Sequence, residues 1–217
     1  MPVRDPGPAR RGRAGFTLIE LLIVISILGV LAAVLLPTLL ETGAAAEESA
    51  TEATMLQLDT ACKTFNRSKG YYPPDDLQWL EKGAKAPWKS DNGRNTGIES
   101  LVCMLSQSTR EGSDLSGLAD SFVNTDADQP GAPLPLLGGR TDRIEIADEW
   151  GTPLVYFSKL NMDKPQTVVP GPEEAPVQVK AKRRPDGSYF GAGKFQLLSA
   201  GKDLTFGTDD DLVWPSN

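Results

Sequence analysis

The sequence predicts an α+β protein in which one long N-terminal helix packs against a small antiparallel sheet. Three observations support this prediction. An apolar run follows a short basic segment, a helical pattern of apolar residues extends that run, and the strand-like patterns all lie in the second half of the chain. The 217 residues leave room for a membrane segment and one ordinary domain.

The apolar run extends from Phe16 to Leu40 and contains a single charged side chain, Glu20. About 25 residues at a rise of 1.5 Å give roughly 37 Å of helix, enough to cross a hydrocarbon core of about 30 Å. The four arginines before it, against one aspartate, place the N-terminus in the cytoplasm. We therefore expect residues 16–40 in the membrane and residues 41–217 beyond it as a globular head.

The helical pattern continues into the head. Four apolar residues recur every three or four positions and so share one helix face. They are Met55, Leu58, Cys62 and Phe65. One helix over about residues 17–68 is predicted, and Gly70 ends it. Pro37 lies inside this helix and lacks a backbone donor, so a kink or loosening is expected there.

The rest of the head predicts two short helices and three strands. The helices are expected at 75–82 and 97–108, and the strands at 154–157, 178–181 and 194–198. A turn at 185–187 lies between the last two strands, and the apolar face of the sheet is expected to pack on the helix from Met55 to Phe65.

Residues 109–147 are rich in glycine, proline and aspartate. This composition predicts a long, variable surface loop rather than core. Trp150, just after it, is expected to anchor the core.

Composition excludes several classes of function. Histidine is absent, which removes the commonest general base and the commonest metal ligand. No Walker A or Gly-x-Ser-x-Gly motif is present, so we do not expect an enzyme. Net charge is −7, and the basic leader makes the remaining chain more acidic still. The basic cluster at residues 180–184 is interpreted as a solvated hairpin end, so no nucleic-acid partner is expected.

The N-terminal stretch resembles that of type IV pilins and type II secretion pseudopilins. The resemblance rests on Gly15, the following Phe16-Thr17-Leu18-Ile19-Glu20, and the apolar run broken at Pro37. It implies a pilin-like fold and a leader, residues 1–15, that a prepilin peptidase removes by cutting after Gly15. It also implies methylation of the new amine on Phe16.

Within this resemblance Glu20 has an assembly role. A carboxylate in an apolar run costs several kcal/mol in a bilayer unless it is paired. The resemblance implies that Glu20 meets the N-terminal amine of a neighbouring copy. The alternative is that Glu20 only reaches the headgroups and water.

Two other kinds of leader fit the sequence less well. An ordinary signal peptide would be cleaved near Ala44-Ala45-Ala46, but the apolar run is too long for it and contains Glu20. A twin-arginine signal at Arg10-Arg11 is poorly supported by the residues that follow.

Residues 199–214 place four carboxylates within nine positions of a glycine-containing loop. Their mutual repulsion would be relieved by Ca²⁺, which binds carboxylate and carbonyl oxygens. The segment resembles the calcium loop of major pseudopilins. The resemblance implies ligands at Asp203, Asp210 and Asp211, with carbonyls near Ala200 and Thr208. Leu204 stands where glycine is common, and the alternative is a solvated acidic tail without an ion.

Cys62 and Cys103 are the only cysteines. Outside the cytoplasm two cysteines can form a disulfide. The alternative is a pair of buried thiols that pack as small hydrophobic groups.

Taken together, the resemblance implies a major pseudopilin of a type II secretion system. Such a subunit sits in the bacterial inner membrane by one span, with its head in the periplasm, and polymerises into a helical homopolymer. Its implied partners are prepilin peptidase, an inner-membrane assembly platform driven by a cytoplasmic ATPase, and minor pseudopilins. The alternatives are a major or minor pilin of a surface type IV pilus and a membrane-anchored calcium-dependent binding module.

Overall fold

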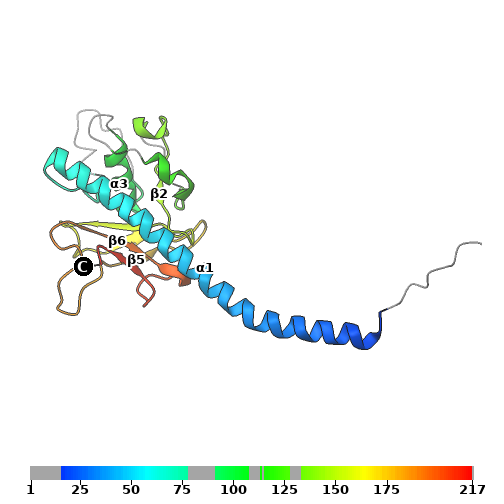
Figure 1. The fold of residues 1–217 in the computed structure, drawn as a ribbon. Coiled ribbons are helices and arrows are strands. Elements are labelled where there is room, and N and C mark those ends of the chain that lie inside the picture. Colours follow the sequence, from blue (N-terminus) through cyan, green and yellow to red (C-terminus); the bar gives the residue numbers. More distant parts are fainter. Residues whose placement is uncertain (1–15, 78–90, 108–112, 114, 128–132, 217) are drawn as a thin grey trace, which may run out of the picture. The chain divides into compact units, whose positions relative to one another are not determined.

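The computed structural model describes residues 16–77, 91–107, 113, 115–127 and 133–216, without the side chains of 36–42. The chain divides into two compact units, Met1–Gly43 and Ala44–Asn217. Helix α1 (Leu18–Lys69) contributes to both (Figure 1). Its bounds confirm the helix predicted over 17–68. The kink expected at Pro37 stays a prediction.

The end of α1 is set by Gly70. Its N–H donates to the carbonyl of Asn66 at 2.8 Å, and its φ of +82° turns the chain away from the helix. This left-handed conformation costs glycine least, which explains why the helix stops there.

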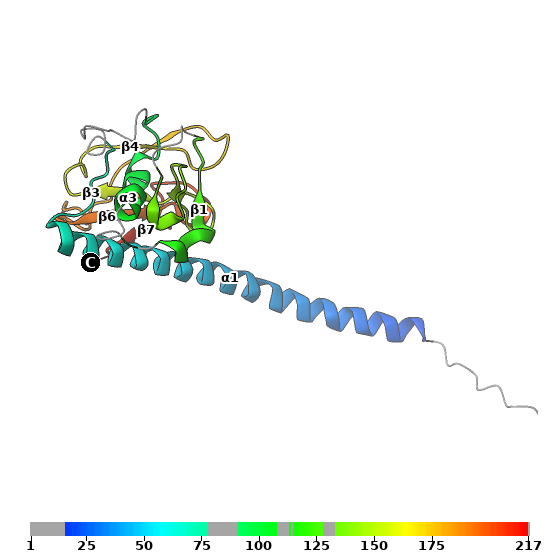
Figure 2. The same ribbon diagram turned by 90° about the horizontal axis from the view of Figure 1, so that it is seen from above.

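The second half of α1 buries one face in the head. Met55, Leu58, Cys62 and Phe65 are all buried, as their spacing predicts. They join a core with α3 (Thr96–Ser106), which confirms the helix predicted at 97–108. Figure 2 shows α3 and the strands lying along this part of α1.

Within the described residues, the strands form three small antiparallel sheets. β1 (Phe122–Val123) pairs with β2 (Glu145–Ile146), and β4 (Gln166–Val168) pairs with β5 (Val177–Val179). The third sheet has the order β3-β6-β7, from β3 (Val155–Ser158), β6 (Phe195–Ser199) and β7 (Leu212–Trp214). β3, β5 and β6 confirm the three predicted strands. They do not share one sheet, because β5 pairs with β4.

Both faces of the β3-β6-β7 sheet are covered. Tyr156, Phe195 and Leu197 belong to the core that contains the α1 face. Val155, Phe157 and Leu198 point to the opposite face and pack with residues of β4 and β5. This alternation follows from the two-residue period of a strand, and it confirms that the sheet packs on α1.

The segment between α3 and β3 is not the surface loop that its composition predicted. Leu115, Leu134, Ile144 and Ile146 are buried in the main core. Two 3₁₀ helices, η1 (Ser116–Ser121) and η2 (Pro135–Leu137), and strands β1 and β2 interrupt it. The prediction was wrong because glycine, proline and aspartate dominate the composition, while a few widely spaced apolar residues supply the contacts.

Two other predictions are revised around α1. Trp150 is half-buried rather than a core anchor, and its indole N–H donates to Glu47 on α1 at 2.8 Å. The helix predicted at 75–82 lies mostly outside the described residues. Within them Asp75 is buried and accepts hydrogen bonds from the N–H and hydroxyl of Ser158 in β3, at 3.0 and 2.7 Å.

The α1 face offers a matched pair of substitutions. Leu58 is 0% exposed and Leu56 is 50% exposed. We expect Leu58→Ala to lower the free energy of unfolding of the head by about 3 kcal/mol, because it leaves a cavity in the core. Leu56→Ala should change it by less than about 0.5 kcal/mol. Chemical denaturation of the full chain in detergent, followed by tryptophan fluorescence, measures both, and equal losses would contradict the packing of this face.

Candidate functional site

The N-terminal half of α1 exposes a long apolar surface. Leu18–Leu35 has a mean hydropathy of 2.9 and is long and apolar enough to cross a membrane. Its large side chains are exposed along its length, as is Phe16 before it. Soluble monomers rarely leave so large an apolar surface in water. Lipid or other helices must therefore cover it.

Glu20 and Thr17 form a capping box at the start of this helix. The N–H and hydroxyl of Thr17 donate to Glu20 Oε2 at 2.8 and 2.7 Å, and the Glu20 N–H donates to Thr17 Oγ1 at 3.3 Å. These contacts satisfy backbone donors that a helix start otherwise leaves unpaired. The Thr-x-x-Glu spacing was visible in the sequence, but this role of Glu20 was not predicted.

The other predicted assembly residues are only partly described. Gly15 and the leader lie outside the described residues. Phe16 is exposed next to the capping box, and α1 runs without interruption through Pro37. Pairing of Glu20 with the amine of another copy stays a prediction. The capping box leaves the carboxylate on the exposed first turn of the helix, where a neighbouring chain can reach it.

The C-terminal loop is a tightly turned segment between β6 and β7. It begins with the 3₁₀ helix η3 (Gly201–Asp203). Gly201 has a φ of +69°, and a Cβ there would lie 2.3 Å from the Asp210 carbonyl oxygen, so no larger residue fits. Leu204 has a φ of +59°, a left-handed conformation that favours glycine, so leucine is strained there.

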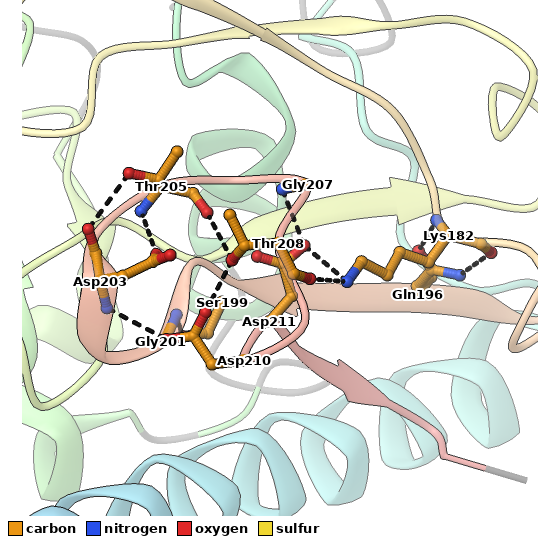
Figure 3. Close-up of polar contacts among 10 residues, drawn as sticks. All are labelled: Lys182, Gln196, Ser199, Gly201, Asp203, Thr205, Gly207, Thr208, Asp210 and Asp211. Carbon is orange, nitrogen blue, oxygen red and sulfur yellow. Dashed lines mark hydrogen bonds and ion pairs between the residues drawn. The ribbon is translucent and has the colours of Figure 1, made fainter.

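The aspartates of this loop bind the loop itself (Figure 3). Asp203 Oδ1 accepts the Thr205 N–H at 2.8 Å. Asp210 accepts the Asp203 N–H at 3.1 Å and the Thr208 hydroxyl at 2.6 Å. The hydrogen bond from Thr208 lowers the pKa of Asp210 from its ordinary value. These hydrogen bonds bring Asp203 and Asp210 together and stabilise the turn.

Lys182, which the sequence placed in a solvated hairpin end, reaches the same loop. Its Nζ lies 2.8 Å from Asp211 Oδ2 and donates to the carbonyl oxygen of Thr208 at 2.7 Å. Two of the five oxygen groups expected to bind calcium are thus bound to an ammonium. Ala200, a third, is buried at the start of η3.

The predicted aspartates also do not converge as metal ligands do. Asp203, Asp210 and Asp211 are all described, and they do not form a group of three carboxylates within 4.8 Å of one another. The hydrogen bonds of these aspartates are made within the chain, while Asp211 Oδ1 is buried without a hydrogen-bond partner. Calcium at this loop stays an expectation from the sequence.

The two cysteines are buried thiols in the main core, and they form no disulfide. Burial raises the pKa of the Cys62 thiol well above its ordinary value, which keeps it neutral. The structure therefore favours the alternative in which both pack as small hydrophobic groups.

A group of carboxylates that the sequence did not indicate lies beside α3 and β2. Oxygen atoms of Glu99, Asp126 and Glu145 lie within 4.8 Å of one another. Arg143, which lies close to Glu145 in the sequence, is fully buried. Its Nη1 lies 3.6 Å from Asp91 Oδ1. Because Glu99 and Glu145 are fully buried, we interpret the group as an internal charge network of the head.

Glu145 is the best-defined member of this network. Its carboxylate accepts hydrogen bonds from the Asn95 amide at 2.8 Å and from the Thr125 N–H at 3.2 Å. Burial outweighs these bonds and raises the pKa of Glu145 to about 7. Asn95 in turn accepts the Val169 N–H at 2.9 Å, so the network ties the start of α3 to the segment after β4.

In the described part of the chain, one apolar N-terminal helix is long enough to cross a membrane, and its continuation into a small α+β head fits a membrane-anchored, pilin-type protein. The family model described as the prokaryotic N-terminal methylation motif matches residues 10–36. This match at the N-terminus supports a relationship to the type IV pilin and pseudopilin family. This motif implies processing by a prepilin peptidase and assembly into pilin-type filaments as a structural subunit. No curated protein and no solved structure matches the chain.

The raised pKa of Glu145 predicts a pH dependence of stability. The folded head holds this proton more tightly than the unfolded chain, whose glutamates titrate near pH 4.3. Its contribution is fully present below that pH and is lost as pH rises through about 7. We expect the unfolding free energy of the full chain to lose about 2 kcal/mol from this group between about pH 5 and pH 8.

Glu145→Gln should flatten this part of the profile, because glutamine resembles the protonated carboxyl group. The exposed Glu149 supplies the control substitution Glu149→Gln, which should keep the wild-type slope. Denaturation in detergent at several pH values measures the three profiles. A Glu145→Gln profile as steep as that of the wild type would contradict the assignment.

Proposed function

We propose that this chain is the major pseudopilin of a type II secretion system, a subunit that polymerises through α1 and drives protein export from the periplasm. The observation that supports this most is the exposed apolar stretch Leu18–Leu35, which begins with a single acid held at the helix start. A surface of this kind is stable in lipid and, once it leaves the lipid, only against copies of itself.

The charge at the start of α1 sets the register of assembly. When helices pack side by side, Glu20 loses water, and a buried carboxylate needs a positive partner. Cleavage after Gly15 creates an amine on Phe16. Head-to-tail stacking brings the amine of one copy to the carboxylate of the next, so that each subunit neutralises its neighbour.

The acidic C-terminal loop supports a secretion pseudopilus over a surface pilus. Its sequence resembles that of major pseudopilins at Asp203, Asp210 and Asp211. The proposed partners are a prepilin peptidase, an inner-membrane assembly platform powered by a cytoplasmic ATPase, and minor pseudopilins. The subunit adds at the base of the filament and performs no chemistry itself.

Glu20→Gln separates the two roles of this residue. Glutamine still accepts the hydrogen bonds of the capping box, so α1 should form and insert normally. Without the negative charge, the contact with the neighbouring amine is lost, and we expect at least about tenfold less filament at equal subunit level. Glu52→Gln, the same change on the exposed side of α1 in the head, is the matched control.

Filaments can be sheared, pelleted and quantified by immunoblot against the membrane-inserted pool. Normal assembly of Glu20→Gln would overturn the charge pairing. Deletion of the gene then tests whether the filament belongs to a secretion system or to a surface pilus. If exported proteins no longer reach the medium, the result supports the secretion role. If export is intact but long extracellular fibres are lost, the result identifies a surface pilus instead.

A further inference from the structure

Lys182 occupies a fixed position beside the C-terminal loop. It follows β5 and precedes a turn in which the Gly187 N–H donates to the Arg184 carbonyl. Gln196 in β6 is fully buried and holds the Lys182 backbone from both sides. Its Oε1 accepts the Lys182 N–H at 2.7 Å, and its Nε2 donates to the Lys182 carbonyl at 3.0 Å. The lysine side chain therefore starts from a defined point on the sheet (Figure 3).

The ammonium group of Lys182 forms an ion pair with the buried carboxylate of Asp211. The side chain of Asp211 is 0% exposed, while that of Lys182 is 28% exposed. Asp211 Oδ2 lies 2.8 Å from Nζ and also accepts the Gly207 N–H at 2.9 Å. A buried carboxylate without a positive partner is strongly destabilising, and Lys182 supplies that partner to Asp211.

The same ammonium also binds the backbone of the loop. It donates to the carbonyl oxygen of Thr208 at 2.7 Å, so one cation joins a backbone carbonyl and a carboxylate of the same turn. A calcium ion would use the same kinds of oxygen in a loop of this kind. A divalent ion bound to these two oxygens would lie next to the ammonium and be repelled by it.

We propose that the ammonium of Lys182 takes the place of a calcium ion in the C-terminal loop and holds the loop against the sheet, so that the head is stable without calcium. Asp203 and Asp210 stabilise the same loop by accepting hydrogen bonds from its N–H and hydroxyl groups. The proposal concerns stability of the subunit and applies to either kind of filament.

The test compares thermal unfolding of the full chain in detergent, with chelator and with millimolar calcium chloride. We expect the wild-type Tm to be the same in both. Lys182→Met keeps the aliphatic stem but removes the ammonium, and its Tm in chelator should be lower by about 5 °C. Lys180→Met removes the same charge from an exposed residue two positions away and should leave Tm unchanged in chelator.

Calcium should return part of the lost Tm to Lys182→Met alone, because the oxygens of Asp211 and Thr208 are then open to another cation. Lys182→Arg keeps a cation and should stay independent of calcium, which covers the case in which Lys182→Met does not fold. A wild-type Tm that rises with calcium would overturn the proposal. So would a Lys182→Met variant as stable as Lys180→Met, or one that calcium does not restore.

Discussion

Burial of one face of α1 is the interaction on which the head depends. Met55, Leu58 and Phe65 give α3 and the β3-β6-β7 sheet a common surface to pack on. The three small sheets are too short to be stable alone. β3 and β6 take part in two cores, because they bury Tyr156 and Phe195 in the core shared with α1 and Phe157 and Leu198 in a second core on the opposite face. The helix that anchors the protein is therefore also the scaffold of its head.

The same helix meets a different constraint at its other end. Over Leu18–Leu35 the exposed surface is apolar on all sides, so no folded domain can cover it from one face. The one acid in this region, Glu20, is kept at the first turn by Thr17. In the proposed filament, this carboxylate is the group that pairs with the amine of a neighbouring subunit.

Features set by local pattern were predictable from the sequence, and features set by distant contacts were not. The bounds of α1, its buried face and the strand at Val155–Ser158 follow from periodicity and from Gly70. The pairing of β4 with β5 and the core contributed by Leu115 and Ile144 join segments whose local composition gives no such signal. The Thr17–Glu20 capping box is also a local feature, because the Thr-x-x-Glu spacing indicates it.

The C-terminal loop shows how much of a site's geometry depends on residues outside its own sequence motif. Asp203, Asp210 and Asp211 stand where the resemblance places calcium ligands, yet the structure gives each an internal partner. The deciding residue, Lys182, lies 29 positions before Asp211 in the sequence and reaches it only because Gln196 fixes the intervening chain on β6. No local motif contains that information.

The mass of the mature N-terminus tests most directly whether this chain is a processed filament subunit. Protein purified from membranes of cells that contain the peptidase should begin at Phe16 and carry one methyl group on its amine. A chain that begins after Ala46 would contradict the central claim because it lacks Glu20, and one that retains residues 1–15 in such cells would contradict it because Phe16 then carries no free amine.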